Sequence, residues 1–180
     1  QNTMRDAMVA SLSLNIFHKY TRRLKMANIA QIANVLQSMV LTQGDKMVRT
    51  PTYHTFRMYN VHQDAMHLPT VCDSPEFTDE LDRKCPIVDV TASRNAEGKI
   101  NMTLTNTSLD QKAEVTVDMP ANGKTKISAE ILTSENAQDH NDFDRPDTVK
   151  PAEFKDFKIK DGKLIVKMPP MSIIAVSAEL

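Results

Sequence analysis

The sequence contains no tryptophan, only four glycines and only two cysteines in 180 residues. No apolar run approaches the ~20 residues that a helix needs to span a bilayer, and no basic start followed by an apolar segment predicts a secretion signal. The 22 Lys and Arg residues nearly balance the 23 Asp and Glu residues, which gives a net charge of −1. This balance predicts neither a nucleic acid nor a membrane as partner.

Glutamate is absent from the first part of the chain, where no Glu precedes Glu76. Within residues 1–67 the acids are Asp6, Asp45 and Asp64, and none of them ends a predicted strand. This part of the chain therefore offers no pair of glutamates for acid–base catalysis. The sequence also begins at Gln1 without an initiator Met and enters a helical pattern at once, so we expect it to be cut from a longer protein.

The cysteines and histidines show no metal-binding pattern. Cys72 and Cys85 lack C-x-x-C spacing, and either a disulfide in an exported protein or two free thiols fits the sequence. The acidic loop at 139–147 lacks the Gly and the terminal Glu of a calcium loop. The histidines do not have the spacing of a ligand set; they are His18, His54, His62, His67 and His140. We expect no metal and no cofactor.

The first third of the chain has helical periodicity. Apolar residues from Met4 to Phe17 recur at helical spacing, after a Thr3 and Asp6 pair that is typical of a helix start. Thr50-Pro51 predicts the start of a second helix. The apolar face of this helix would carry Tyr53, Phe56 and Tyr59. Between the helices, residues 25–30 (KMANIA) form either a buried strand or the start of another helix. The order helix, strand, helix fits one and a half units of a repeating β/α fold.

From Cys85 onward the periodicity changes to two. The alternating apolar sets that predict strands are Val88/Val90/Ala92, Ile100/Met102/Leu104, Ala113/Val115/Val117/Met119 and Ile127/Ala129/Ile131. Asp161-Gly162 predicts a hairpin between segments 157–160 and 163–168, and segment 172–178 predicts a last strand. Many short alternating strands predict an antiparallel β-sandwich or jelly roll over residues 86–180. The polar segment 68–85 would connect it to residues 1–67.

Several stretches resemble family 51 α-L-arabinofuranosidases. The densest matches are residues 25–37 (KMANIAQIANVLQ), 45–48 (DKMV), 50–54 (TPTYH) and 58–63 (MYNVHQ). Residues 141–146 (NDFDRP) and 168–174 (MPPMSII) are similar to the jelly-roll domain of that family. The resemblance covers nearly the whole chain. It implies that residues 1–67 are the end of a (β/α)8 barrel (helix, eighth strand, helix) and that residues 86–180 are the β-sandwich domain.

The resemblance also implies an activity for a parent enzyme. The family removes terminal α-L-arabinofuranosyl groups from arabinan, arabinoxylan and related oligosaccharides with retention of configuration, and its members often form homo-oligomers. It uses two glutamates at the ends of the fourth and seventh barrel strands, a position that falls upstream of Gln1 here. We therefore expect this chain alone to be inactive. The resemblance assigns an arabinose contact to Gln31, at the end of the eighth strand; a helix-capping role is the alternative.

A second function is open for the sandwich, because a β-sandwich beside a glycosidase can bind polysaccharide by itself. Such modules present aromatic side chains on which sugars stack. The chain has no Trp, and its three tyrosines lie in the helical part. We therefore favour a structural role, in which the sandwich supports the barrel. The compartment depends on the parent: extracellular or periplasmic if it carries a signal peptide, cytoplasmic otherwise.

The helices of residues 1–67 lack the barrel partners that the resemblance implies. We expect this part to pack against a second molecule, or to lie against the sandwich in a rearranged, mostly helical form. A strand at residues 25–30 would lose both of its hydrogen-bonding neighbours. We expect these residues to be coil, helix, or a strand with a new partner.

Overall fold

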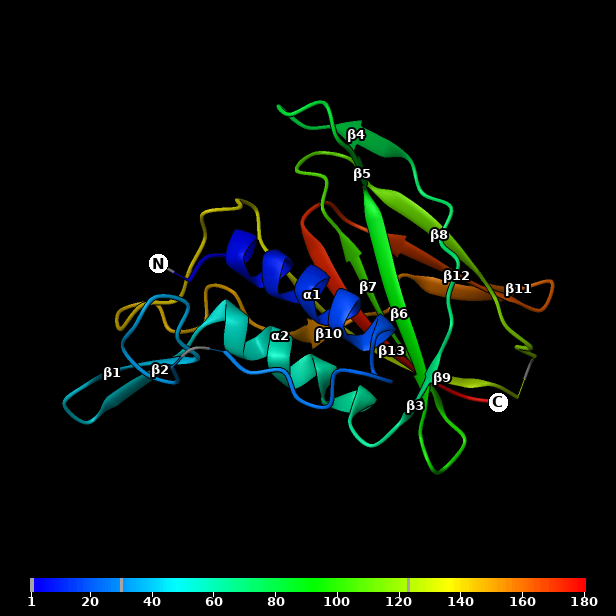
Figure 1. The fold of residues 1–180 in the computed structure, drawn as a ribbon, viewed down its shortest axis with the longest axis horizontal. Coiled ribbons are helices and arrows are strands. Elements are labelled where there is room, and N and C mark those ends of the chain that lie inside the picture. The colour runs from blue at the N-terminus through cyan, green and yellow to red at the C-terminus, as the bar shows by residue number, and fades with distance from the viewer. Residues whose placement is uncertain (1, 30, 123) are drawn as a thin grey trace.

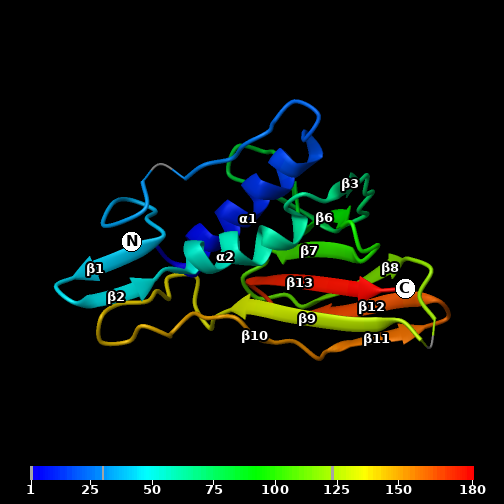
Figure 2. The ribbon, with the colours of Figure 1, turned by 90° about the horizontal axis from the view of Figure 1, so that it is seen from below.

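The structure, a computed structural model, describes residues 2–29, 31–122 and 124–180. The regular secondary structure of these residues is mostly β-strand, together with two α-helices and a short 3₁₀ turn. They are arranged in three layers: the helices, a six-stranded sheet and a three-stranded sheet (Figures 1 and 2). None of the helices in these residues is long and apolar enough to cross a membrane.

The six-stranded sheet has the order β10-β9-β13-β7-β6-β3, and all its neighbours are antiparallel. Its strands are β3 Met66–Leu68, β6 Val88–Arg94, β7 Ile100–Asn106, β9 Lys126–Thr133, β10 Ala152–Glu153 and β13 Ser172–Glu179. The antiparallel three-stranded sheet has the order β11-β12-β8. Its strands are β8 Ala113–Asp118, β11 Phe157–Lys160 and β12 Lys163–Met168.

The two sheets pack face to face around one apolar core, as the period-two pattern predicts. Val88, Ile100 and Met102 are buried in this core, so their predicted inward faces are confirmed. Val115 and Val117 also pack against it but are half-buried, because β8 is an edge strand beside an open cleft. The β11–β12 hairpin is also confirmed.

That hairpin turns at Asp161-Gly162, where the φ angles are 51° and 74°. Both angles lie in the left-handed region that a two-residue type I′ turn requires. Glycine adopts this region without strain, and aspartate tolerates it better than most residues do. The turn therefore follows directly from the Asp-Gly pair.

Both predicted helix starts are confirmed. Helix α1 spans Met4–Lys19, and the carboxylate of Asp6 accepts hydrogen bonds from the Thr3 backbone N–H at 2.9 Å and from its hydroxyl at 3.0 Å. Helix α2 spans Pro51–Tyr59 and continues into η1, Asn60–His62. The Thr50 hydroxyl oxygen accepts from the backbone N–H of Tyr53 at 3.2 Å, as an N-cap does.

The predicted buried face of α2 is wrong. Tyr53 and Phe56 are only half-buried, whereas the neighbouring polar positions Thr52 and Thr55 are fully buried. The reason is a close approach to α1: the Thr55 hydroxyl lies 3.4 Å from the backbone oxygen of Ala7. A small side chain is needed at this contact, and an aromatic ring does not fit there.

The helices lie side by side on the outer face of the six-stranded sheet (Figure 2). A second apolar cluster joins the N-terminal half of α1 to α2, β9 and β13; its buried members are Met4, Ala7, Met8, Met58, Leu132, Val149, Met171, Ile173 and Ala175. Strand β13 is consequently buried on both faces, with Ile174 towards the sandwich core and Ile173 towards the helices. Phe17, in the C-terminal half of α1, is exposed.

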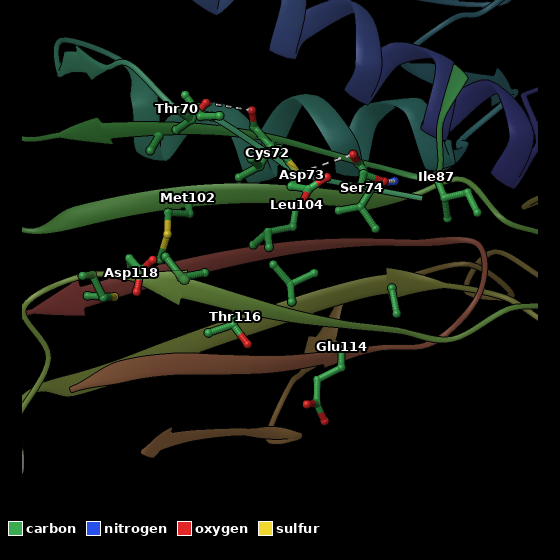
Figure 3. A pocket seen from close by; sticks show the side chains of 18 of the residues that line it. Thr70, Cys72, Asp73, Ser74, Ile87, Met102, Leu104, Glu114, Thr116 and Asp118 are labelled. Carbon is green, nitrogen blue, oxygen red and sulfur yellow. Dashed lines mark hydrogen bonds between the residues drawn. The ribbon is translucent and has the colours of Figure 1, made fainter. Parts of the chain in front are cut away.

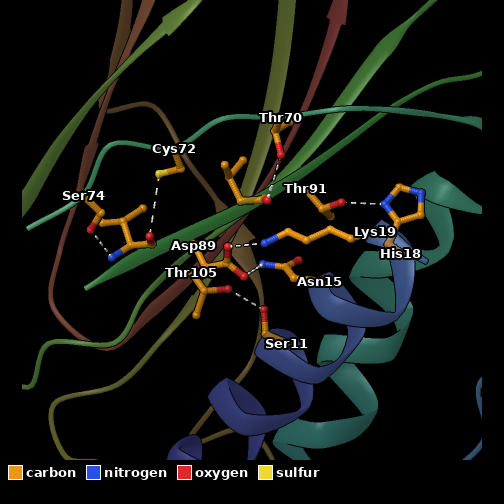
Figure 4. A network of polar contacts seen from close by, with 12 residues as sticks. Ser11, Asn15, His18, Lys19, Thr70, Cys72, Ser74, Asp89, Thr91 and Thr105 are labelled. Atoms are coloured by element: carbon orange, nitrogen blue, oxygen red, sulfur yellow. Dashed lines mark hydrogen bonds and ion pairs between the residues drawn. The ribbon is translucent and has the colours of Figure 1, made fainter. Parts of the chain in front are cut away.

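Under the C-terminal half of α1 the sheet is polar. Four buried hydroxyls from β6 and β7 face the helix layer: those of Thr91 and Thr105 contact α1, and those of Ser93 and Thr103 contact η1. Figure 4 shows the contacts: Asn15 and Lys19 reach the carboxylate of Asp89 at 3.1 and 2.8 Å. The Tyr59 hydroxyl donates to the backbone oxygen of Ser11 at 2.9 Å, and burial raises the pKa of this tyrosine. This layer of contacts is hydrogen-bonded rather than apolar.

Residues 25–29 form no strand, which confirms the expectation for a strand without neighbours; Ala30 lies outside the described residues. Five short strands before β6 were not predicted. Strands β1 Val40–Gln43 and β2 Lys46–Arg49 form a hairpin between the two helices. The polar segment 68–85 contains β4 Glu76–Thr78, paired with β5 Lys84–Pro86. Strand β3 precedes that segment and pairs with β6.

Candidate functional site

Gln31 lies in the loop between α1 and β1, where it is exposed to solvent. With Asn34, Val35 and Leu36 it lines an open hollow at the surface. The amide of Asn34 is not free to bind a ligand there: Nδ2 donates to the Thr42 hydroxyl at 2.8 Å, and Oδ1 accepts from the Thr42 backbone N–H at 2.8 Å. Asn34 thus holds the loop on β1, which leaves Gln31 as the polar side chain of the hollow.

The acids of the first third belong to separate elements. Asp6 caps α1, Asp45 lies in the β1–β2 turn, and Asp64 follows η1 with a φ of 53°. The three acids therefore serve three different parts of the fold.

Both cysteines are free thiols, so of the two possibilities left by the sequence the disulfide does not occur. The Cys72 thiol lies 3.7 Å from the backbone oxygen of Val88. Burial, followed by the charge of Asp89, raises the pKa of the Cys72 thiol. A raised pKa disfavours the thiolate, so Cys72 is not an activated nucleophile.

Three histidines whose sequence spacing predicts no common site lie close together in the structure. His18 on α1 lies with its ring centroid 4.7 Å from those of both His62 on η1 and His67 on β3. Among the described residues, no group of three or more His, Cys, Asp or Glu side chains is arranged to hold a metal ion. No sequence signal could have found this cluster, because its members come from three elements that only the tertiary fold brings together.

A cleft lies between the two sheets, on the side where β8 ends its sheet (Figure 3). It has a volume of about 660 Å³ and is bounded by β8 on one side and by β6, β7 and residues 68–75 on the other. Its walls include Val90, Met102, Leu104 and Val117, and no aromatic side chain lines it. A sugar ring finds no stacking surface here, so the cleft does not favour the polysaccharide-binding alternative.

These features define a class of protein domain: a β-sandwich with a layer of helices packed on the outer face of its larger sheet. The sequence profile of the α-L-arabinofuranosidase C-terminal domain matches residues 1–172. The chain belongs to this family.

Relatives from bacteria agree with this assignment. The chain is 49% identical over 179 residues to the intracellular exo-α-L-arabinofuranosidase of Bacteroides ovatus. This alignment covers 99% of this chain and 35% of the relative. The solved GH51 arabinofuranosidase from Xanthomonas axonopodis pv. citri is 38% identical, with a TM-score of 0.92 over 99% of this chain and 36% of that one. The α-L-arabinofuranosidase of Thermotoga maritima shares the fold, with a TM-score of 0.86 at 21% identity over 99% of this chain and 39% of that one.

The chain therefore spans about a third of the length of the relatives it matches. Its resemblance to family 51 enzymes is confirmed along almost its whole length. The Xanthomonas comparison also corrects one expectation. The helices of residues 1–67 do lie against the sandwich, but since the match includes both layers, they are not rearranged relative to that enzyme.

Proposed function

We propose that this chain is the C-terminal part of a retaining α-L-arabinofuranosidase whose parent removes terminal arabinofuranosyl groups from arabinan- or arabinoxylan-type polysaccharides and oligosaccharides. Residues 1–67 are the last units of its (β/α)8 barrel, and residues 86–180 are a jelly-roll-like sandwich that supports the barrel. One observation carries the proposal: the match to a solved GH51 arabinofuranosidase includes the helix layer as well as the sandwich. The name of the Bacteroides ovatus relative supports an intracellular location.

The exposed apolar surface of the helix layer supports the proposal that further elements of a barrel cover it in the parent. Large apolar side chains are exposed on α1 and on the loop after it; they are Val9, Ile16, Phe17, Tyr20, Leu24 and Met26. A monomeric protein rarely leaves such a set together in water. The upstream part of the barrel is the occupant that we assign to this surface, and its fourth and seventh strands supply the two glutamates.

The 180-residue chain alone is expected to show no turnover of 4-nitrophenyl α-L-arabinofuranoside. Retaining hydrolysis needs two carboxyl groups about 5 Å apart, one as nucleophile and one as acid and base. The assay uses the chain purified from a host that lacks such enzymes, with the intact parent enzyme as positive control. Turnover near that of the intact enzyme would contradict the proposal that both glutamates lie upstream.

Gln31 is proposed to contact the arabinose bound in the parent. A neutral amide donates to and accepts from sugar hydroxyls without competing for the catalytic proton. In the full-length parent, Gln31→Ala is expected to lower kcat/KM by about 10-fold, the loss that follows from one or two neutral hydrogen bonds. Asn34→Ala is the matched control: its amide holds Thr42, so it is expected to affect stability more than kcat/KM. An unchanged kcat/KM in the Gln31 variant would contradict the contact.

A further inference from the structure

Three histidine rings meet at the end of α1 that lies over the β3–β6 edge of the six-stranded sheet. His18 comes from α1, His62 from η1 and His67 from β3. The His18 ring centroid lies 4.7 Å from each of the other two. Since the three residues belong to three elements, their contact ties the helix layer to the sheet edge. We call them the histidine latch.

Hydroxyl groups of the sheet make hydrogen bonds with two of the three latch rings. His18 Nδ1 lies 2.6 Å from Thr91 Oγ1. His62 Nδ1 lies 2.7 Å from Ser93 Oγ, and His62 Nε2 lies 2.8 Å from Thr103 Oγ1. A hydroxyl either donates or accepts, so it suits a neutral imidazole, which has one donor and one acceptor nitrogen. These contacts hold the rings in place without a charge on either side.

The charged groups around the latch do not favour a proton on it. Asp89 is the carboxylate that faces it, and its two oxygens are taken by Lys19 Nζ at 2.8 Å and by Asn15 Nδ2 at 3.1 Å. Lys19 adds a positive charge of its own. From α2 the neighbouring titratable group is Tyr59, whose ring centroid lies 5.7 Å from that of His62. From β6 and β7 the other contacting groups are hydroxyls.

The pKa values of the latch follow from burial and from the mutual repulsion of its rings. Burial, and then His67, lowers the pKa of His18 to about 4. Burial, and then the other two histidines, lowers the pKa of His62 to about 3. Burial, and then Lys19, lowers the pKa of His67. The Nε2 atoms of His18 and His67 are buried without a hydrogen-bond partner, so neither has a neighbouring acceptor for an added proton.

The sign of the pH dependence follows from these values. An imidazole in an opened state has a pKa of ~6.5, above the values in the closed state. The closed state therefore binds fewer protons than the opened state in the range between them. The stability that the neutral latch contributes is fully present above pH ~6.5, and it is lost as the pH falls from there towards ~4.

We propose that the histidine latch is an acid-sensitive switch: when neutral it holds the C-terminal end of α1 and η1 on the edge of the six-stranded sheet, and when protonated it releases them. The opening is local, because the apolar cluster anchors α1 at its other end, through Met4, Ala7 and Met8. The loop that follows α1 carries Gln31, so the release would also free this residue, a consequence that rests on the proposed function.

Hydrogen exchange of the whole chain, read residue by residue by NMR between pH 7.5 and 5, tests the switch without reference to activity. A closed-state pKa of about 4 for one histidine raises the opening equilibrium at pH 5 about 30-fold over neutral pH. We expect protection in the last turn of α1, corrected for intrinsic exchange, to fall by at least this factor, and to stay below that of β7 at every pH. Constant protection in that turn, or protection equal to that of β7 throughout, would overturn the switch.

Variants assign the effect to the latch. In the double variant His18→Gln with His67→Gln, the pH dependence in the last turn of α1 is expected to shrink to what His62 alone leaves. His54→Gln is the matched control, since burial also lowers the pKa of His54 to about 4, but His54 lies on α2 beside Arg57 and Arg49. It is expected to leave the pH dependence of that turn unchanged. Full pH dependence in the double variant would overturn the proposal.

The unmodified chain provides an independent readout if the double variant does not fold. The imidazole signals of His18 and His62 are expected to titrate near pH 4 or below, and that of His67 is expected to titrate below its usual pKa. Three midpoints near 6.5 would overturn the proposal, since the rings would then gain protons as readily in the closed state as in the opened one.

Discussion

Replacing Ile174 by alanine is expected to lower the free energy of unfolding by about 3 kcal/mol, within the range measured for buried Ile-to-Ala changes. Ile174 is fully buried in the sandwich core, as the third residue of β13. It lies opposite Leu104 on β7 and Ile131 on β9. Its truncation leaves a cavity that both neighbouring strands line, and strands fixed by ladders on both sides cannot collapse far into it. Urea denaturation followed by circular dichroism measures the change.

Leu36→Ala is the control for this experiment, because Leu36 is 88% exposed and its truncation removes little buried surface. We expect this variant to unfold within about 0.5 kcal/mol of the unmodified chain. A loss below about 1 kcal/mol for Ile174→Ala would contradict the tight packing of the sandwich core.

Replacing Asn141 by alanine is expected to cost about 3 kcal/mol, even though it removes only a small polar group. Asn141 is almost fully buried in the long loop between β9 and β10. Its Nδ2 donates to the backbone oxygens of Arg49 and Val149, both at 2.8 Å, and its Oδ1 accepts from the Val149 N–H at 2.7 Å. Alanine would leave three backbone groups without their partner, and a buried unpaired group costs about 1–3 kcal/mol.

The same urea titration measures this change, with Asp144→Ala as control in the same loop, since Asp144 is exposed. Asn141→Asp separates the donor from the acceptor: it keeps an oxygen for Val149 but turns a carboxylate towards two carbonyl oxygens. We expect it to be about as costly as alanine. A variant Asn141→Ala as stable as Asp144→Ala would contradict the role of this side chain in joining the loop to β2.

Local sequence patterns predicted the elements whose geometry depends only on their own residues. The Asp161-Gly162 pair specifies a two-residue turn, and Thr50-Pro51 specifies a helix start, so both appear where expected. The inward apolar faces of the sandwich strands follow from strict alternation, which places every second side chain on one face. These inferences need no knowledge of what lies on the other side of each element.

The packing of the helices on the six-stranded sheet could not be predicted, because local patterns carry no information about neighbouring elements. Thr91 and Thr103 occupy the alternate positions of β6 and β7, which look like solvent-facing positions, yet both are fully buried because α1 and η1 cover them. Alternation states which face a side chain is on, but not what covers that face. The α2 face failed similarly, because the close approach of Thr55 to α1 is a tertiary contact.

The candidate site depended on resemblance more than on pattern. Gln31 has no local signal that separates a sugar contact from a helix cap, and the family resemblance alone selected it. The latch had no signal at all, since His18, His62 and His67 come together only when η1 and β3 fold back to the end of α1.

The position of strand β13 delays the completion of the six-stranded sheet during synthesis. It is the last strand along the chain, but it lies between β9 and β7 inside the six-stranded sheet. While a ribosome makes the protein, β6 and β7 can pair early, but β7 then waits with an open edge until more than 60 further residues have emerged. Both apolar clusters also wait, since β13 contributes to each. Pairings that span such a separation form slowly, so the edge of β7 stays open to wrong pairings until β13 arrives.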